Sequence, residues 1–84
     1  MDAIKTQIKQ FILNEFLPGE AEANLRDDFP LREGGILDSL GLLRVITFVE
    51  AGFNIEVGPL DAGDNNFGTV ERIAAFVDSK VRSL

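Results

Sequence analysis

Two neighbouring polar residues, Asp38 and Ser39, stand between a glycine pair and an apolar run in the stretch GGILDSLGLLRV, residues 34–45. A serine hydroxyl in this setting can act as a nucleophile, cap a helix, or accept a group that another protein attaches. Nucleophilic catalysis needs a base, but the chain has no histidine, no G-x-S-x-G pattern surrounds Ser39, and no Ser-x-x-Lys begins there. The sequence therefore argues against an enzyme and leaves capping and attachment open.

A second polar cluster, DAGDNNFGTVE at residues 61–71, is similar to part of a calcium-binding loop. If Gly68 took the glycine position of such a loop, the first ligand would fall on Gly63 and the bidentate acid on Ala74. Neither residue carries a carboxylate, so turn formation explains the cluster better. The chain also lacks cysteine and histidine, the usual zinc ligands, and we predict no metal site.

Composition and charge restrict the class of protein. An apolar fraction of 45% suffices for a core, and no linker divides the chain, so we expect one domain over residues 1–84. The net charge of −6 disfavours nucleic acid and anionic membranes as partners. No stretch is apolar enough to span a bilayer, and MDAIKTQIKQF does not resemble a signal peptide. We expect a free-standing, monomeric, cytoplasmic protein.

Helical periodicity predicts the elements that position these residues. Apolar side chains recur at helical spacing over residues 3–17 and again over 70–81, where Thr69 is the expected N-cap. A short helical turn is expected within residues 62–67, and no segment alternates over strand length. The fold class is therefore all-α, a four-helix bundle with a long loop between helices one and two. The apolar residues expected to anchor the connecting segments are Leu25, Phe29, Leu31, Ile55, Val57, Leu60 and Phe67.

The predicted second helix, about residues 39–51, has Asp38 or Ser39 as its N-cap and Gly52 at its end. Most of its positions are apolar, and the exceptions, spaced by three, are predicted to form one narrow stripe of Gly41, Arg44, Thr47 and Glu50. Three amphipathic neighbours cannot cover such a helix, so Leu40 and Leu43 should stay partly exposed beside Ser39 and suggest a docking surface. A fully buried helix is the alternative.

The stretch GGILDSLGLLRVITFVEAGFNIEV, residues 34–57, closely resembles the signature of acyl and peptidyl carrier proteins, in which Gly-x-x-Asp-Ser-Leu opens the second helix. The resemblance extends over nearly the whole chain, including DDFPL in the long loop and NNFGTVERIAAFV near the end. It implies an acyl-carrier-like bundle without catalytic activity, in which Ser39 accepts 4′-phosphopantetheine from coenzyme A through a phosphodiester. The thiol of that group would hold cargo as a thioester.

The resemblance also implies partners. Asp38 would help a phosphopantetheinyl transferase to recognise Ser39, and a partner-binding surface is implied at Leu40, Gly41, Leu43, Arg44, Thr47 and Glu50. Carriers of fatty-acid synthesis have acidic residues near the start of this helix, where the present chain has Gly41 and Arg44. The pattern is more similar to stand-alone carriers of aminoacyl or specialised-metabolism pathways, which a dedicated adenylating or acyl-loading enzyme serves before downstream acyl-processing enzymes. The alternative is an unmodified helical interaction domain in which Ser39 is only a helix cap.

Overall fold

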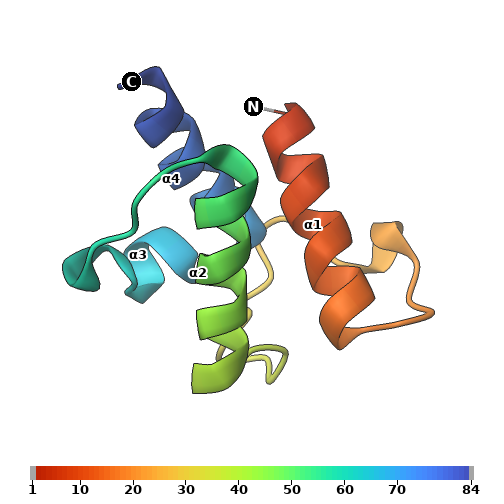
Figure 1. Ribbon diagram of the computed structural model, residues 1–84. Coiled ribbons are helices and arrows are strands. Elements are labelled where there is room, and N and C mark those ends of the chain that lie inside the picture. Colours follow the sequence, from red (N-terminus) through yellow and green to blue (C-terminus); the bar gives the residue numbers. More distant parts are fainter. Residues whose placement is uncertain (1, 84) are drawn as a thin grey trace.

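A computed structural model describes residues 2–83, and this part of the chain is helical and contains no strand. The elements follow in the order α1 (Asp2–Phe16), η1 (Glu22–Asn24), α2 (Ser39–Phe53), η2 (Pro59–Asp61), α3 (Asp64–Phe67) and α4 (Val70–Arg82), where η denotes a 3-10 turn. Figure 1 shows α1, α2 and α4 as the long members, and the short α3 packs against α4. The predicted all-α bundle of four helices, with a long loop between the first two, is confirmed.

The core forms where α1, α2 and α4 meet, and α1 packs chiefly against α4. Each helix contributes side chains at the three- and four-residue spacing that places them on one face. The largest side chains with no solvent exposure are Ile8, Ile12, Leu31, Val45, Val49, Phe67, Val70, Ile73 and Val77. The start of α1 and the end of α4 lie at one end of the bundle, and the start of α2 lies at the other (Figure 1).

Most of the expected loop anchors reach the core. Leu25, Leu31, Ile55 and Phe67 are buried, while Phe29 and Val57 are partly buried against it. Leu60 is 97% exposed, so its predicted role as an anchor is wrong. The reason is local: Asp61 Oδ2 accepts a hydrogen bond from the Gly58 backbone N–H at 3.0 Å, which closes the turn η2 and leaves Leu60 at its tip.

Helix α2 ends later than predicted. Gly52 is helical, and the helix continues to Phe53. Asn54 then takes the left-handed conformation, with φ 56° and ψ 51°, and its N–H donates to the Glu50 carbonyl. Asparagine tolerates this conformation better than most residues because its short polar side chain bonds locally. The left-handed C-cap at Asn54, rather than the glycine at position 52, therefore sets the end of α2.

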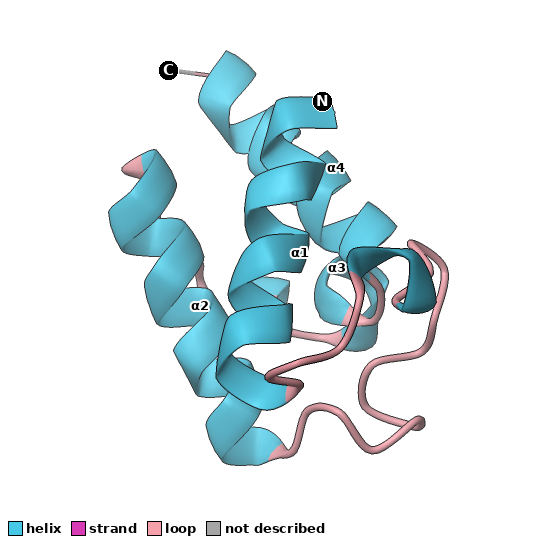
Figure 2. Ribbon diagram, turned by 90° about the vertical axis from the view of Figure 1, so that its right-hand side faces the viewer, coloured by secondary structure: helices cyan, strands magenta, loops and turns pink. Residues whose placement is uncertain are grey.

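Asp27 fastens the long loop between α1 and α2 to the rest of the molecule. Lys9 Nζ lies 2.6 Å from Asp27 Oδ1, and Lys5 Nζ lies 3.2 Å from Oδ2. The Asp27 carbonyl accepts from the Glu71 backbone N–H at 3.0 Å, which connects the loop to α4 as well. The hydrogen bond from Lys9 is the main cause that lowers the pKa of the Asp27 carboxyl, and Lys5 adds to it, although partial burial opposes both. Figure 2 shows the loop running along one side of α1 before it returns to the start of α2.

The ion pairs of Asp27 with Lys5 and Lys9, which we call the Asp27 clamp, predict a pH-dependent contribution to the free energy of unfolding. Asp27→Asn is expected to lower the midpoint of thermal unfolding at neutral pH, because a neutral amide cannot replace the carboxylate between two ammonium groups. Folding lowers the pKa of Asp27, so its stabilisation is present above the unfolded-state value of about 3.9 and is lost as the pH falls through the folded-state value. The difference between parent and variant, measured by circular dichroism, should therefore shrink below about pH 4.

Asp28→Asn is the matched control for this prediction. Asp28 is the next residue of the same loop, but its side chain is mostly exposed and pairs with the exposed Arg26 at 3.1 Å. Ion pairs of this kind contribute little to stability. If Asp28→Asn lowered the midpoint as much as Asp27→Asn at neutral pH, the clamp assigned to Asp27 would be wrong.

Candidate functional site

Asp38 caps α2. Its backbone is extended, with φ −94° and ψ −171°, and its Oδ1 accepts from the Gly41 backbone N–H at 2.7 Å. Its own carbonyl accepts the next helical bond, from the Leu42 N–H at 2.9 Å. Both interactions are those of an N-cap residue. Of the two residues predicted for this position, the structure assigns the cap to Asp38 and makes Ser39 the first helical residue.

Ser39 has no structural partner. Its side chain is exposed, and its hydroxyl forms no hydrogen bond with any of residues 2–83. The backbone N–H groups of Ser39 and Leu40 also have no acceptor within this range, because Asp38 takes the next two donors of the first turn. A free hydroxyl and two free N–H groups therefore stand together at the positive end of a 15-residue helix.

The turn that leads into Ser39 depends on two glycines. Gly35 has a φ of 83°, which glycine adopts without steric cost. A side chain at Gly34 would collide with the Phe29 ring and the Pro30 carbonyl. The N–H groups of Ile36 and Leu37 both donate to the Leu31 carbonyl at 3.0 Å. Because Leu31 and Leu37 are buried, this turn fixes the start of α2 against the core.

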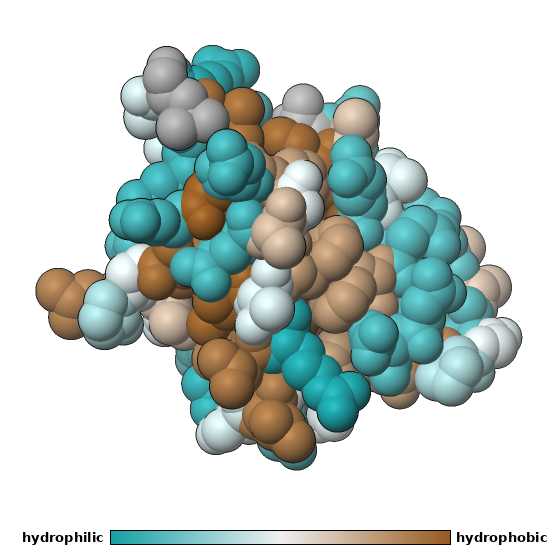
Figure 3. All heavy atoms as spheres, viewed as in Figure 1, coloured by the Kyte–Doolittle hydropathy of each residue, from teal (hydrophilic) through white to brown (hydrophobic). Residues whose placement is uncertain are grey.

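Leu40 and Leu43 lie beside Ser39 and are 60% and 56% exposed. The prediction that these two leucines remain exposed is confirmed, and the alternative of a fully buried second helix is wrong. Figure 3 shows apolar side chains gathered over the lower, N-terminal half of α2. Exposed apolar side chains that lie together beside polar residues are a feature of surfaces that bind another molecule.

The stripe predicted on α2 does not stay on one face. Arg44 and Thr47 are exposed, as expected. Gly41 is buried against Phe16 of α1, and Glu50 is partly buried and accepts from the Val57 N–H at 3.0 Å. An α-helix turns about 100° per residue, so three steps of three residues rotate by about 180° from the starting direction. Gly41 therefore faces α1 and Glu50 faces the segment after α2, and neither belongs to an open surface.

Two hollows adjoin the exposed face of α2. A small one at the start of α2, which we call the N-terminal pocket, has a volume of about 220 Å³ and is lined by Phe16, Gly35, Ile36, Asp38, Leu40, Gly41 and Arg44, but not by Ser39. A larger one, which we call the α1–α2 groove, has a volume of about 610 Å³ and is lined by Phe11, Glu15, Arg44, Thr47, Phe48 and Ala51. Arg44 is part of the lining of both hollows.

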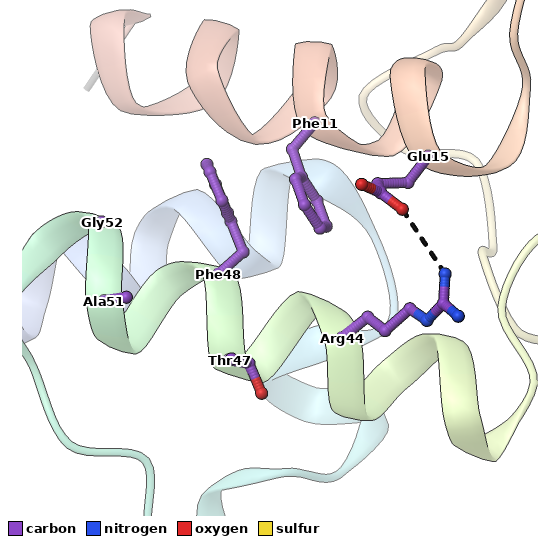
Figure 4. A pocket seen from close by; sticks show the side chains of 7 residues that line it. All are labelled: Phe11, Glu15, Arg44, Thr47, Phe48, Ala51 and Gly52. Carbon is purple, nitrogen blue, oxygen red and sulfur yellow. Dashed lines mark hydrogen bonds and ion pairs between the residues drawn. The ribbon is translucent and has the colours of Figure 1, made fainter.

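The α1–α2 groove is apolar with one charged end (Figure 4). Phe11 of α1 and Phe48 of α2 stack with their ring centres 4.2 Å apart and their planes 12° from parallel. At the end toward Ser39, Arg44 Nη1 lies 3.5 Å from Glu15 Oε2. The sequence alone assigns none of Phe11, Glu15 and Phe48 to a site. The only sequence signal is that Phe11 and Glu15 are four residues apart, which places them on one face of α1.

The polar cluster at residues 61–71 spans the end of η2, the short helix α3 and the start of α4, and its side chains bond to the backbone there. Asn66 Nδ2 donates to the Asp61 carbonyl at 3.0 Å, and Thr69 Oγ1 accepts from the Arg72 backbone N–H at 3.1 Å as the cap of α4.

Residues 2–83 contain no group of three or more His, Cys, Asp or Glu side chains placed to hold a metal ion. Nor does the described part of the chain include a helix with the length and apolarity needed to cross a membrane. A comparison with models of known protein families finds none that matches the chain.

The assignment of the N-cap to Asp38 predicts that substitutions of Asp38 and of Ser39 change the free energy of unfolding by different amounts. Asp38→Ala is expected to reduce the free energy of unfolding by about 1 kcal/mol, because the Gly41 N–H loses its acceptor. Asp38→Asn should retain most of that stability, since asparagine caps as well as aspartate. Ser39→Ala should change it by less than about 0.5 kcal/mol. Urea unfolding followed by circular dichroism measures all three, and a larger loss for Ser39→Ala than for Asp38→Ala would contradict the assignment.

Proposed function

We propose that the chain is a stand-alone acyl or aminoacyl carrier protein, with 4′-phosphopantetheine attached to Ser39. The observation that carries this proposal is the state of Ser39: an exposed hydroxyl at the start of α2 with no structural role, because Asp38 is the cap. The free N–H groups of Ser39 and Leu40 and the helix dipole suit the phosphate of that group. The residues present therefore fit the prosthetic group that the carrier resemblance implies.

The attachment reaction needs no base from this chain. The Ser39 Oγ forms a bond to the phosphorus that carries pantetheine in coenzyme A, and the bond from that phosphorus to adenosine 3′,5′-bisphosphate breaks. The hydroxyl proton passes to a base of a separate phosphopantetheinyl transferase, which agrees with the absence of histidine here. The attached group supplies a thiol that holds cargo as a thioester.

The exposed face of α2 supports an assignment of partners. Asp38, exposed next to Ser39, is the residue we expect the transferase to recognise. Leu40, Leu43, Arg44 and Thr47 form the surface on which an adenylating or acyl-loading enzyme, and then the acyl-processing enzymes, would dock. An arginine in place of acidic residues near the start of α2 favours a dedicated aminoacyl or specialised-metabolism pathway over general fatty-acid synthesis. We place this monomeric carrier in the cytoplasm.

The second candidate is an unmodified interaction domain, and the exposure of Leu40 and Leu43 favours it as well. In that case a partner helix would cover the two leucines, and Ser39 would take no part. The capping role that this interpretation gave to Ser39 belongs to Asp38. The two candidates therefore differ in one chemical respect, which is whether Ser39 becomes modified.

Intact-protein mass spectrometry after incubation with coenzyme A and a broad-specificity phosphopantetheinyl transferase tests the proposal. The carrier function requires that the folded chain gains one phosphopantetheine group. A folded sample that gains no mass, in a reaction where a known carrier is modified, would contradict it. That result would leave the interaction domain as the better interpretation.

A further inference from the structure

The α1–α2 groove contains one aromatic pair and one charged pair, placed one helical turn apart. Glu15 follows Phe11 by four residues on α1, and Arg44 precedes Phe48 by four residues on α2. Residues four apart lie on the same face of a helix, separated by about one turn. The two helices run in opposite directions (Figure 1), so the two charges face each other at one level and the two rings at the next (Figure 4).

The two charged side chains keep free donors and acceptors. Arg44 Nη1 and Glu15 Oε2 are 3.5 Å apart, which is longer than a good charge-assisted hydrogen bond, and the side chains are 56% and 42% exposed. The guanidinium carries five N–H donors and the carboxylate two acceptor oxygens. A ligand can therefore place a carboxylate on Arg44 and an ammonium group on Glu15 at the same time.

The remainder of the lining suits a ring. Phe11 and Phe48 are partly buried and stack on each other, and the small side chain of Ala51 leaves space beside them. Aromatic side chains of this kind pack favourably against the face or edge of a further ring. The groove volume of about 610 Å³ lies within the range of small-molecule sites.

The spacing of the two pairs sets the length of the ligand. One helical turn rises about 5.4 Å. In an aromatic α-amino acid a single methylene joins the ring to the carbon that bears both charged groups. The charged atoms then lie about 5 Å from the ring centre, by covalent bonds of about 1.5 Å. Such a molecule can reach the charged pair and the aromatic pair together.

The charge of the chain also favours a zwitterion. The net charge of −6 disfavours a simple carboxylate, whereas an amino acid has no net charge. Glu15 and Arg44 are the two charged residues of the groove lining, and their charges cancel. The groove therefore presents one positive and one negative group to a ligand that carries one of each.

We infer that the α1–α2 groove binds a free aromatic α-amino acid, with its carboxylate on Arg44, its ammonium group on Glu15 and its ring against Phe11 and Phe48. The inference goes beyond the proposed function. The groove lining does not include Ser39, so binding needs no group attached to that residue and no partner protein.

Titration of the unmodified, ¹⁵N-labelled chain with L-phenylalanine tests the inference. In ¹⁵N–¹H NMR spectra the amide signals of Phe11, Glu15, Arg44 and Phe48 should shift and saturate, while those of α3 should stay in place. No saturable shift up to the solubility limit of L-phenylalanine would overturn the inference. Shifts centred on any other part of the chain would overturn it as well.

Three analogues separate the contacts. Phenylacetate lacks the ammonium group, phenethylamine lacks the carboxylate, and L-alanine lacks the ring. Each should bind about tenfold more weakly than L-phenylalanine, a factor that corresponds to about 1.4 kcal/mol. If phenylacetate or phenethylamine bound as tightly as L-phenylalanine, the charged pair would take no part in recognition. Equal binding of L-alanine would exclude the contact with the rings, and either result would overturn the inference.

Substitutions of the charged pair provide a second test. Arg44→Gln and Glu15→Gln should each weaken binding of L-phenylalanine by about tenfold, because each removes one charged contact. Arg82→Gln is the matched control, since Arg82 forms an exposed ion pair with Asp78 at 3.1 Å on α4, and it should bind like the parent. Unchanged affinity in either groove variant would overturn the inference. The mass measurement on Ser39 is independent of these results, so the two proposals can fail separately.

Discussion

Ser39→Ala abolishes the gain of mass on incubation with coenzyme A and a phosphopantetheinyl transferase, if the proposed function is right. The hydroxyl oxygen is the atom that bonds to phosphorus, and alanine has no atom to replace it. Ser79→Ala is the matched control, since Ser79 is an exposed serine on α4 and its loss should leave the modification unchanged. A Ser39→Ala chain that still gains one phosphopantetheine would show that another residue is the attachment point.

This experiment is informative because the Ser39→Ala substitution is expected to leave the fold intact. The Ser39 hydroxyl makes no hydrogen bond with residues 2–83, and alanine has the highest helix propensity. The helix keeps its cap at Asp38. The thermal midpoint of Ser39→Ala should therefore match that of the parent, and loss of modification can be assigned to the missing oxygen.

Phe67→Ala should cause the largest loss of stability among the single substitutions considered. Phe67 has no solvent exposure, it is the one buried residue of α3, and its ring centre lies 5.5 Å from that of Phe76 on α4. Phenylalanine-to-alanine changes in a core cost about 3–5 kcal/mol. A chain of this length is typically stable by about 4–13 kcal/mol, so the loss is about a quarter of the total or more and would unfold a chain at the lower end of that range.

Leu60→Ala is the control for this prediction, and urea unfolding measures both variants. Leu60 and Phe67 are both apolar residues of the segment between α2 and α4, and the sequence alone predicts both as anchors. Leu60 is 97% exposed, so its truncation should change the free energy of unfolding by less than about 0.5 kcal/mol. Comparable losses in the two variants would contradict the burial that the structure assigns to them.

The helices were predictable because each long one carries its own periodic signal. The segments over α1 and α4 repeat apolar residues at three- and four-residue spacing, which defines both the element and its buried face. The connecting segments carry no such signal. Leu60 and Phe67 differ in exposure because of the backbone path through η2 and α3. The residue types of this segment do not specify that path. Asp27 likewise pairs with Lys5 and Lys9 through contacts between residues far apart in the chain.

The candidate site was predictable to the extent that it is local. Asp38 and Ser39 follow from the residues next to them, and the exposure of Leu40 and Leu43 follows from an excess of apolar positions that neighbours cannot cover. The groove was not predictable, because it exists only where α1 crosses α2. Phe48 adds bulk to α2, but its direction, toward Phe11, depends on how the two helices pack.

The placement of the helix ends has a practical consequence. The start of α1 and the end of α4 lie at one pole of the bundle, and the start of α2, whose first residue is Ser39, lies at the opposite pole (Figure 1). A bead, a dye or a fused protein joined near residue 2 or residue 83 would leave the pole that carries Ser39 pointing outward and accessible to other molecules. Attached in this way, the chain would present the Ser39 hydroxyl and the exposed leucines Leu40 and Leu43 at the end farthest from its support.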